Sequence, residues 1–308
     1  MGKQDSSQDK VIVYKGMTFD EIRAKAESGD AYYQGQLGLF YIRGYFCQAD
    51  NVEGAKWLKL SAEQNHPFGL FGLACLETNE ETAAQAYKKC FTAMEKLAEE
   101  GDAEAQHILA YLYLYGNGVA KDLVKAFEWR RLAAEQGYPR AQFLLGHMYY
   151  YGQGVEKDLT QAAEWFRKAA EQGNALAQFS LGRMYLNGEG LEEDKAKAVD
   201  WFRKSAEQGN AFAQCRLGSQ YDYGGGVEQD KAKAAEWYRK AAEQGDVAAQ
   251  CQLGFMYSKG NGVEKDEAKA AEWFRKAAEQ GNASAQLMLG HMYTNGSGVE
   301  KDLGCAHK

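Results

Sequence analysis

The sequence predicts an all-α fold, a right-handed superhelical α/α solenoid of about seven 36-residue helical hairpins with half-repeats at both ends. Tryptophan recurs every 36 residues, a period typical of stacked repeat arrays. Both prolines also lie on this register, at the first residue of a predicted helix, where proline is best tolerated. The tryptophans are Trp57, Trp129, Trp165, Trp201, Trp237 and Trp273, and the prolines are Pro67 and Pro139.

The register divides the chain into a tail, a capping helix and a solenoid. Residues 1–14 are predicted to be a polar, disordered tail. Residues 15–28 are predicted to be an N-terminal capping helix, because Thr18 and Glu21 have the spacing of a capping box. The solenoid covers residues 29–308, and the repeat at 65–100 is degenerate, with Ala93 at the tryptophan position and no glycine turn. The repeats are 29–64, 65–100, 101–136, 137–172, 173–208, 209–244, 245–280 and a partial repeat at 281–308.

Each repeat is predicted to begin with a helix that carries an internal glycine. In the repeat 173–208, Gly173 ends the preceding helix and Asn174 is the N-cap of the next one. Glycine costs a helix about 1 kcal/mol relative to alanine, yet Gly182 has a counterpart in most repeats. We interpret this as the close approach of a second helix. The counterparts are Gly38, Gly146, Gly218, Gly254 and Gly290, with Ala74 and Ala110 in the remaining repeats.

A glycine turn and a second helix complete the repeat. The turn Gly188-Glu189-Gly190-Leu191 is followed by Asp194, an N-cap for the second helix. Neither helix pair can bury its apolar face alone, so stacking of neighbouring repeats supplies the core. The residues of the second helix predicted to face that core are Ala198, Trp201, Phe202 and Ala206.

The composition argues against several classes of partner. The net charge is −7 with both signs interspersed, and no basic stripe indicates nucleic acid or an anionic membrane surface. No apolar run approaches the roughly 18 residues of a membrane span, and no signal peptide is recognised at the N-terminus. We therefore expect a cytoplasmic protein that neither inserts into membranes nor binds nucleic acid.

The cysteines indicate a reducing compartment. Cys215 and Cys251 occupy one position in neighbouring repeats, which helix packing places about 9–10 Å apart, beyond the reach of a disulfide. Cys75 and Cys90 lie within one repeat, and the sequence leaves open whether they pair.

The repeated residues resemble a known family. The pattern Ala-Gln-x-x-Leu-Gly-x-Met-Tyr-x-x-Gly-x-Gly-Val, followed by Ala-Ala-Glu-Trp-Phe-Arg-Lys-Ala-Ala-Glu-Gln-Gly-Asn, is similar to the Sel-1-like repeat family, a subgroup of the tetratricopeptide-like helical solenoids. The resemblance is strong over residues 101–302 and weaker over 29–100. It implies an adaptor of the kind used in signalling, in membrane-protein quality control and in bacterial interactions with hosts or toxins. Some secreted bacterial relatives carry a disulfide in each repeat and a weak penicillin-binding or β-lactamase activity; the cysteines here are not regularly paired.

Three patterns that could carry chemistry have simpler interpretations. The segment Gly116–Lys121 is similar to a phosphate loop, but it follows a helix and recurs in nearly every repeat, so we interpret it as a structural turn. The segment Ser7-Gln8-Asp9-Lys10 satisfies the serine-x-x-lysine pattern of penicillin-interacting enzymes without their other motifs. The histidines have no zinc-ligand spacing. We therefore expect no enzymatic activity, no cofactor and no metal site.

The first helix of each repeat also carries positions that differ between repeats. By resemblance to tetratricopeptide arrays, these positions line the concave groove. They form one helical stripe rich in the residue types of interface hot spots. The candidate partner-binding residues are Tyr111, Tyr115, Arg140, His147, Tyr150, Tyr151, Arg183, Asn187, Tyr223 and Phe255. Other residues on the same stripe are Glu104, His107, Phe143, Leu176, Phe179, Phe212 and Lys259.

These features together predict a non-enzymatic protein–protein interaction scaffold that holds a partner protein or peptide in its concave groove. One alternative is a bacterial toxin-neutralising (immunity) protein or host-interaction effector, which is a binder with a single dedicated partner. A second alternative is a weak hydrolase of the penicillin-interacting type.

Overall fold

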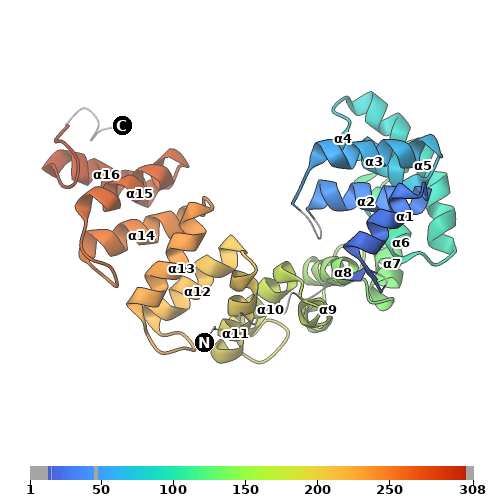
Figure 1. Cartoon of the computed structure of the whole chain (residues 1–308). Coiled ribbons are helices and arrows are strands. Elements are labelled where there is room, and N and C mark those ends of the chain that lie inside the picture. Colours follow the sequence, from blue (N-terminus) through green and yellow to red (C-terminus); the bar gives the residue numbers. More distant parts are fainter. Residues whose placement is uncertain (1–12, 15, 45–47, 303–308) are drawn as a thin grey trace, which may run out of the picture. The chain divides into compact units, whose positions relative to one another are not determined.

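The computed structural model describes residues 13–14, 16–44 and 48–302. These residues form sixteen helices and one two-stranded antiparallel sheet, and the helices follow one another as hairpins, which confirms the predicted all-α solenoid (Figure 1). The chain divides into two compact units, which we describe separately. The N-terminal unit comprises Met1–Ala141 with Gln153–Val155, and the C-terminal unit comprises Gln142–Gly152 with Glu156–Lys308.

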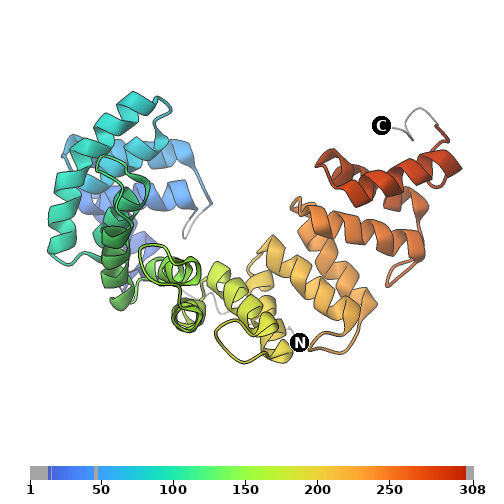
Figure 2. The same cartoon turned by 180° about the vertical axis from the view of Figure 1, so that it is seen from behind.

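Each repeat consists of a first helix, here called the A helix, and a second, the B helix. The A helices are α2 (Ala31–Arg43), α4 (Pro67–Leu76), α6 (Ala103–Tyr115), α8 (Pro139–Tyr151), α10 (Ala175–Asn187), α12 (Ala211–Tyr223), α14 (Val247–Lys259) and α16 (Ala283–Asn295). The B helices are α3 (Asn51–Glu63), α5 (Glu80–Glu99), α7 (Leu123–Glu135), α9 (Leu159–Glu171), α11 (Lys195–Glu207), α13 (Lys231–Glu243) and α15 (Glu267–Glu279). The alternation of A and B helices can also be followed from behind (Figure 2).

The first helix, α1 (Phe19–Glu27), begins where the capping box predicts. The Thr18 backbone N–H donates to the Glu21 carboxylate at 2.7 Å, and the Glu21 N–H donates to Thr18 Oγ1 at 3.3 Å. Because Thr18 has an extended backbone, the helix begins four residues after the predicted boundary at residue 15. Strand β1 (Val13–Tyr14) pairs with β2 (Met17–Thr18), so the last two residues of the predicted tail belong to a small hairpin. The rest of that tail lies outside the described residues.

The helix boundaries follow the predicted caps. Asn174 accepts a hydrogen bond from the Ala177 N–H at 2.9 Å, and Asp194 accepts one from the Lys197 N–H at 2.9 Å. Gly173, which lies between α9 and α10, has a backbone φ of +91°, which only glycine adopts without strain. Pro67 and Pro139 are the first residues of α4 and α8, as the register predicts.

The degenerate repeat differs from the others in the lengths of its helices. Its A helix, α4, has 10 residues, and its B helix, α5, has 20 and begins at Glu80. Asn79 caps α5 by accepting the Thr82 N–H at 3.0 Å. An N-terminal extension of the B helix therefore stands where other repeats have a glycine turn.

The glycine inside each A helix lets the B helix of the same hairpin approach closely. A Cβ added at Gly182 would lie 2.8 Å from Phe202 Cδ1 and Cε1, closer than such atoms approach one another. The residues aligned with Gly182 and Phe202 vary together. Glycine faces an aromatic ring at Gly146–Phe166, Gly182–Phe202, Gly218–Tyr238 and Gly254–Phe274, and the branched side chain of Leu58 at Gly38. In the two repeats with Ala74 and Ala110, the residue aligned with Phe202 is the unbranched Met94 or Arg130. This covariation explains why alanine replaces glycine in those two repeats.

A glutamine near the start of most A helices ties neighbouring helices together. The Gln178 side chain donates to the Ala170 carbonyl of the preceding B helix at 3.1 Å and accepts from Gln208, at the end of its own B helix, at 2.7 Å. Gln178 is only 5% exposed, so both of its polar atoms need these partners. The same glutamine pair occurs at Gln34–Gln64, Gln106–Gln136, Gln142–Gln172, Gln214–Gln244 and Gln250–Gln280.

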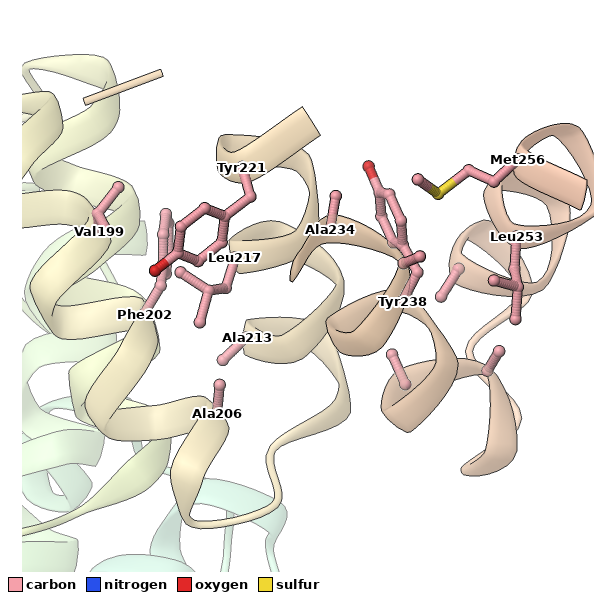
Figure 3. Close-up of a cluster of buried hydrophobic side chains, with 14 of the residues drawn as sticks. Val199, Phe202, Ala206, Ala213, Leu217, Tyr221, Ala234, Tyr238, Leu253 and Met256 are labelled. Carbon is pink, nitrogen blue, oxygen red and sulfur yellow. The ribbon is translucent and has the colours of Figure 1, made fainter. Parts of the chain in front are cut away.

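The core consists of small and aromatic residues that alternate between neighbouring helices. Figure 3 shows Ala206 facing Ala213 and Phe202 close to Leu217 and Tyr221, where α11 meets α12. The alanines let the helix backbones approach, and the aromatic rings fill the space between them. Each such cluster spans consecutive hairpins, so no hairpin has a complete core of its own.

The tryptophans lie at the edge of this core and in contact with it, so Trp201 faces the core as predicted but is less deeply buried than Phe202. The next residue, Phe202, is fully buried, whereas Trp201 is half-buried and packs against the core of the preceding hairpin. Lys204 covers the indole ring, with Nζ 4.0 Å from the ring centroid. The same lysine–tryptophan pair occurs at Lys168–Trp165, Lys240–Trp237 and Lys276–Trp273.

The close approach at Gly182 yields a stability prediction. We expect Gly182→Ala to lower the free energy of unfolding by about 1–3 kcal/mol through overpacking against the buried Phe202 ring. The cost of Gly182→Ala should be smaller in a Phe202→Met background, because a flexible side chain can move away from the new methyl group. Urea unfolding followed by circular dichroism would measure this double-mutant cycle. Unchanged unfolding of Gly182→Ala, or strict additivity of the two substitutions, would show that the contact is not limiting.

Candidate functional site

Exposed tyrosines stand at the ends of three A helices. Tyr115, Tyr151 and Tyr223 are the last residues of α6, α8 and α12, and all three are largely exposed, Tyr223 to 70%. A glycine of positive φ follows each of them and ends the helix, so no further helical turn covers the ring. The sequence prediction placed all three tyrosines in the partner-binding set, and their exposure is compatible with that role.

In the C-terminal unit, exposed large apolar residues gather on the A helices. Among the described residues of this unit, no B helix carries an exposed large apolar residue. The exposed large apolar residues of the unit are Tyr151, Leu176, Phe212, Tyr223 and Leu287. We call the variable positions of the A helices, those aligned with Leu176, Phe179, Arg183 and Asn187, the A-helix face. This face is the candidate functional site.

A small depression lies on the A-helix face between α8 and α10. A carboxylate organises one side of it: Glu189, in the glycine turn after α10, accepts from the Tyr150 hydroxyl at 2.8 Å and from the Asn187 side-chain amide at 3.1 Å. Both oxygens of this carboxylate are therefore engaged, which fixes the Tyr150 ring. The lining residues are His147, Tyr150, Tyr151, Phe166, Ser180, Arg183, Met184 and Glu189.

The imidazole of His147 lies in the aromatic part of this depression. It stacks on the Tyr151 ring, with centroids 5.8 Å apart, and meets the Phe166 ring edge-on at 5.2 Å. Burial lowers the pKa of His147, and the positive charge of Arg183 lowers it further. At neutral pH the imidazole is therefore uncharged, and Arg183 is the cation of the depression. The structure thus brings together five predicted residues: His147, Tyr150, Tyr151, Arg183 and Asn187.

The N-terminal unit holds a second aromatic cluster around Tyr111. The Tyr111 ring meets Phe71 edge-on at 5.7 Å and lies 4.7 Å from the Tyr115 ring. Tyr111 is half-buried, and its neighbour Tyr87 donates its hydroxyl to Cys75 Sγ at 3.6 Å. Tyr111 is thus held by packing, whereas Tyr115 is free to contact a partner.

Two residues expected on the stripe are buried instead. Glu104 is 1% exposed and accepts from Arg43 at 2.8 Å, and His107 is 4% exposed with its ring edge-on to Tyr138 at 5.2 Å. These placements correct the expectation that Glu104 and His107 line a groove. Their polarity suggested exposure, but the ion pair and the aromatic contact allow burial.

Arg140 and Phe255 are less exposed than Tyr115 or Tyr223. Arg140 is half-buried, and its charge contributes to lowering the pKa of His107. Phe255 is half-buried, and its ring meets Phe274 edge-on at 5.0 Å, as His147 meets Phe166. Phe255 therefore contributes mainly to packing.

The described cysteines are free thiols, so Cys75 and Cys90 do not pair. Burial raises the pKa of Cys90 and of Cys215 to about 12 in each case. Burial also raises the pKa values of Cys75 and Cys251. A thiol with a raised pKa is protonated near pH 7 and is a poor nucleophile. These four thiols therefore give no indication of cysteine catalysis.

A larger cavity of about 440 Å³ lies at the last described hairpin, between α14 and α16. Phe274, Met288 and Met292 form its apolar part, and Lys259 and His291 lie at its polar part. Lys265 and Glu267, which also line it, form an ion pair at 2.9 Å. This cavity occupies the same place between consecutive A helices as the depression between α8 and α10.

Sequence reasoning missed Glu189, which organises the depression. The turn position that it occupies holds an uncharged residue in the other repeats with a glycine turn, for example Asn117, Gln153 and Asn261. This difference was visible in the sequence, but the turn was interpreted only as a structural element. A charged residue at a repeat position that is otherwise uncharged is a signal that could have identified it.

Within the described ranges, no group of three or more His, Cys, Asp or Glu side chains could hold a metal ion. The described helices include none that is both long enough and apolar enough to cross a membrane. The segment Ser7-Gln8-Asp9-Lys10 lies outside the described residues.

The sequence matches the Sel1 repeat family model in seven segments: 31–66, 103–138, 139–174, 175–210, 211–246, 247–282 and 283–304. Each segment begins at the first residue of an A helix, and residues 67–102, which include the degenerate repeat's helices, are not matched. No curated protein matches the chain.

Two solved structures are similar in both sequence and fold. One is c5321, described as a protective antigen present in uropathogenic Escherichia coli strains with an SLR fold; it is 38% identical, with a TM-score of 0.73, over 94% of this chain. The present chain covers 62% of the length of c5321. The other is a Sel1 repeat protein from Oxalobacter formigenes, 35% identical with a TM-score of 0.65, over 74% of this chain and 91% of its own.

The burial of His107 predicts a pH-dependent stability. Burial, reinforced by the charges of Arg130, Arg140 and Arg43, holds the pKa of His107 well below its ordinary value. The unfolded chain takes up this proton as the pH falls through about 6.5, but the folded chain does not, so the folded state loses stability toward acid. We expect the melting temperature to fall between pH 7.5 and pH 5.5, and to fall less in His107→Phe. An equal fall in the variant and the wild type would contradict the assignment.

Proposed function

We propose that this chain, which belongs to the Sel1 repeat family, is a non-enzymatic scaffold that binds a partner protein or peptide on its A-helix face. The observation that carries the proposal is the clustering of exposed aromatic residues on A helices, where Tyr151, Phe212 and Tyr223 are each more than half exposed. Aromatic side chains bury large areas on binding at a low cost in conformational entropy, which is why they dominate interface hot spots.

The contacts that recur from hairpin to hairpin also support a binding role for the variable positions of the A helix. The repeated residues of the A helix, such as Gln178 and Gly182, hold the hairpins together. The exposed variable residues of the same helix take little part in that packing. A rigid array with a variable face suits recognition, because a rigid surface loses little conformational entropy on binding. We propose that this face is the predicted concave groove and that it takes an extended segment or a helix.

Two alternatives differ from the general scaffold in the nature of the ligand. An immunity or host-interaction protein would use the same face for one dedicated partner, and the functions encoded by neighbouring genes would distinguish it. A penicillin-interacting hydrolase would open the ring of a chromogenic β-lactam, and Ser7→Ala would abolish that activity. We favour the scaffold because the A-helix face exposes Tyr151, Phe212 and Tyr223, side chains of the kind that dominate interface hot spots.

The proposal predicts that partner binding depends on the A-helix face. We expect the triple variant Tyr151→Ser, Phe212→Ser, Tyr223→Ser to lose the partner that the wild type captures from the native cell, with a melting temperature close to wild type because the three side chains are exposed. Affinity capture followed by mass spectrometry would measure the loss.

The matched control removes exposed apolar side chains from B helices instead. The variant Val52→Ser, Val124→Ser, Leu132→Ser alters residues that are 70%, 56% and 39% exposed. It should retain the partner. Retention by both variants, or loss from the B-helix variant alone, would place the binding surface elsewhere.

A further inference from the structure

Two arginines on the A helices of the C-terminal unit form no ion pair with a described residue, although the chain as a whole is acidic. Its net charge is −7, yet α10 and α12 present Arg183 and Arg216 at variable positions. Neither arginine forms an ion pair or a hydrogen bond with another described residue. The nearby carboxylates are already engaged: Glu189 by Tyr150 and Asn187, and Asp222 by Lys231 at 2.6 Å.

Arg183 is the better placed of the two cations. It is half-buried in the depression between α8 and α10, beside the uncharged imidazole of His147. A guanidinium that is partly withdrawn from water and has no counter-ion gains most from a ligand carboxylate, which it can bind through two parallel N–H···O bonds. Ser180 lines the same depression and supplies a hydroxyl that can donate to such a ligand.

Arg216 extends the positive charge to the next A helix. It lies 36 residues after Ser180, so it occupies on α12 the position that Ser180 occupies on α10. Arg183 on α10 is aligned in turn with His147 on α8. Arg183 and Arg216 therefore hold, between α10 and α12, the aligned positions that His147 and Ser180 hold in the depression between α8 and α10.

An apolar seat lies on the same stripe of α10 as Arg183. Leu176 and Phe179 precede Arg183 by seven and four residues, which places all three on one side of the helix. The Phe179 ring lies 6.2 Å from the ring of Phe212, which is 64% exposed. Seven residues of helix span about 10 Å, the length of about three residues of an extended chain.

From this arrangement we propose that the A-helix face of the C-terminal unit recognises an extended acidic peptide segment, in which an aspartate or glutamate bound by Arg183 lies about three residues from an apolar side chain seated on Leu176, Phe179 and Phe212. This inference rests on the proposed function and adds the chemistry of the partner. A nucleic acid could also stack its bases on Phe179 and Phe212, but two arginines on an acidic chain do not form the basic stripe that binds a phosphate backbone.

A displayed library of random extended peptides tests the inference on the full chain. We expect the selected peptides to carry an acidic residue about three positions from an aromatic or aliphatic one. For a selected peptide, Arg183→Gln should weaken binding about tenfold to a hundredfold, the range expected for a charge-assisted hydrogen-bonded pair. Replacing the acidic residue of the peptide by its amide should weaken binding to the wild-type protein by the same factor. The same replacement should have little further effect on binding to Arg183→Gln. Binding to the wild type should also weaken as salt is added.

The controls separate charge recognition from folding and from general electrostatics. Lys195→Gln removes a positive charge from α11, where Lys195 pairs with Glu193 at 3.5 Å, and should leave peptide binding unchanged. Arg183→Lys keeps the charge but not the fork of donors and should fall between wild type and Arg183→Gln. Circular dichroism would establish that each variant is folded.

Selected peptides that lack acidic residues, or that bind Arg183→Gln as well as wild type, would overturn the inference and leave the proposed function standing. A library that yields no binding peptide would count against the proposed function as well. Binding of a single-stranded oligonucleotide that depends on Arg183, without any binding of acidic peptides, would also overturn the inference.

Discussion

The close contact between the two helices of each hairpin is the constraint on which the rest of the structure depends. In four hairpins an aromatic ring of the B helix lies directly over a glycine of the A helix, as Phe202 lies over Gly182, and in the first hairpin Leu58 lies over Gly38. The glycine weakens its own helix by about 1 kcal/mol, and the buried ring offsets this through packing. Where the ring is replaced by Met94 or Arg130, alanine takes the place of glycine. The hairpin therefore depends on matched pairs rather than on a fixed residue.

The glutamine pairs convert this local contact into a stacked array. Gln178 bonds to the preceding B helix and to the end of its own, and five other A-helix glutamines form the same pair with the end of their own B helix. A buried amide with an unmet donor or acceptor is costly, so these bonds specify how one hairpin sits on the next. Because glycine, glutamine and alanine hold the array, the remaining A-helix positions are free to vary. The exposed aromatics and Arg183 stand at those positions.

Much of the fold could be predicted because its signals are local and repeated. The caps at Asn174 and Asp194, the prolines and the glycines each depend on backbone chemistry within a few residues. The repeat identified Trp201 as a core-facing residue but not how deeply it is buried, because periodicity identifies a repeated contact and not its depth. Trp201 and Phe202 are neighbours in sequence, and only the packing of three helices decides which one is central. The role of the glutamines was missed for a related reason, since their partners lie 30 residues away.

The candidate site was less predictable than the fold, because exposure at a variable position depends on partners from other helices. Glu104 and His107 share the stripe with exposed residues, but Arg43 and Tyr138 allow them to be buried. In contrast, Tyr151 and Tyr223 are largely exposed, as expected, whereas Tyr111 and Arg183 are half-buried. Tyr150 and Asn187 were among the predicted residues, but Glu189, the carboxylate that positions both, was not.

The central claim is that the residues not used to hold the hairpins together form the recognition surface. Site-specific photo-crosslinking in the native cell tests it most directly, with benzoylphenylalanine in place of Tyr223 on an A helix or of Val124 on a B helix. The account predicts a covalent adduct with a specific partner from position 223 and none from position 124. Adducts formed only from position 124 would contradict it.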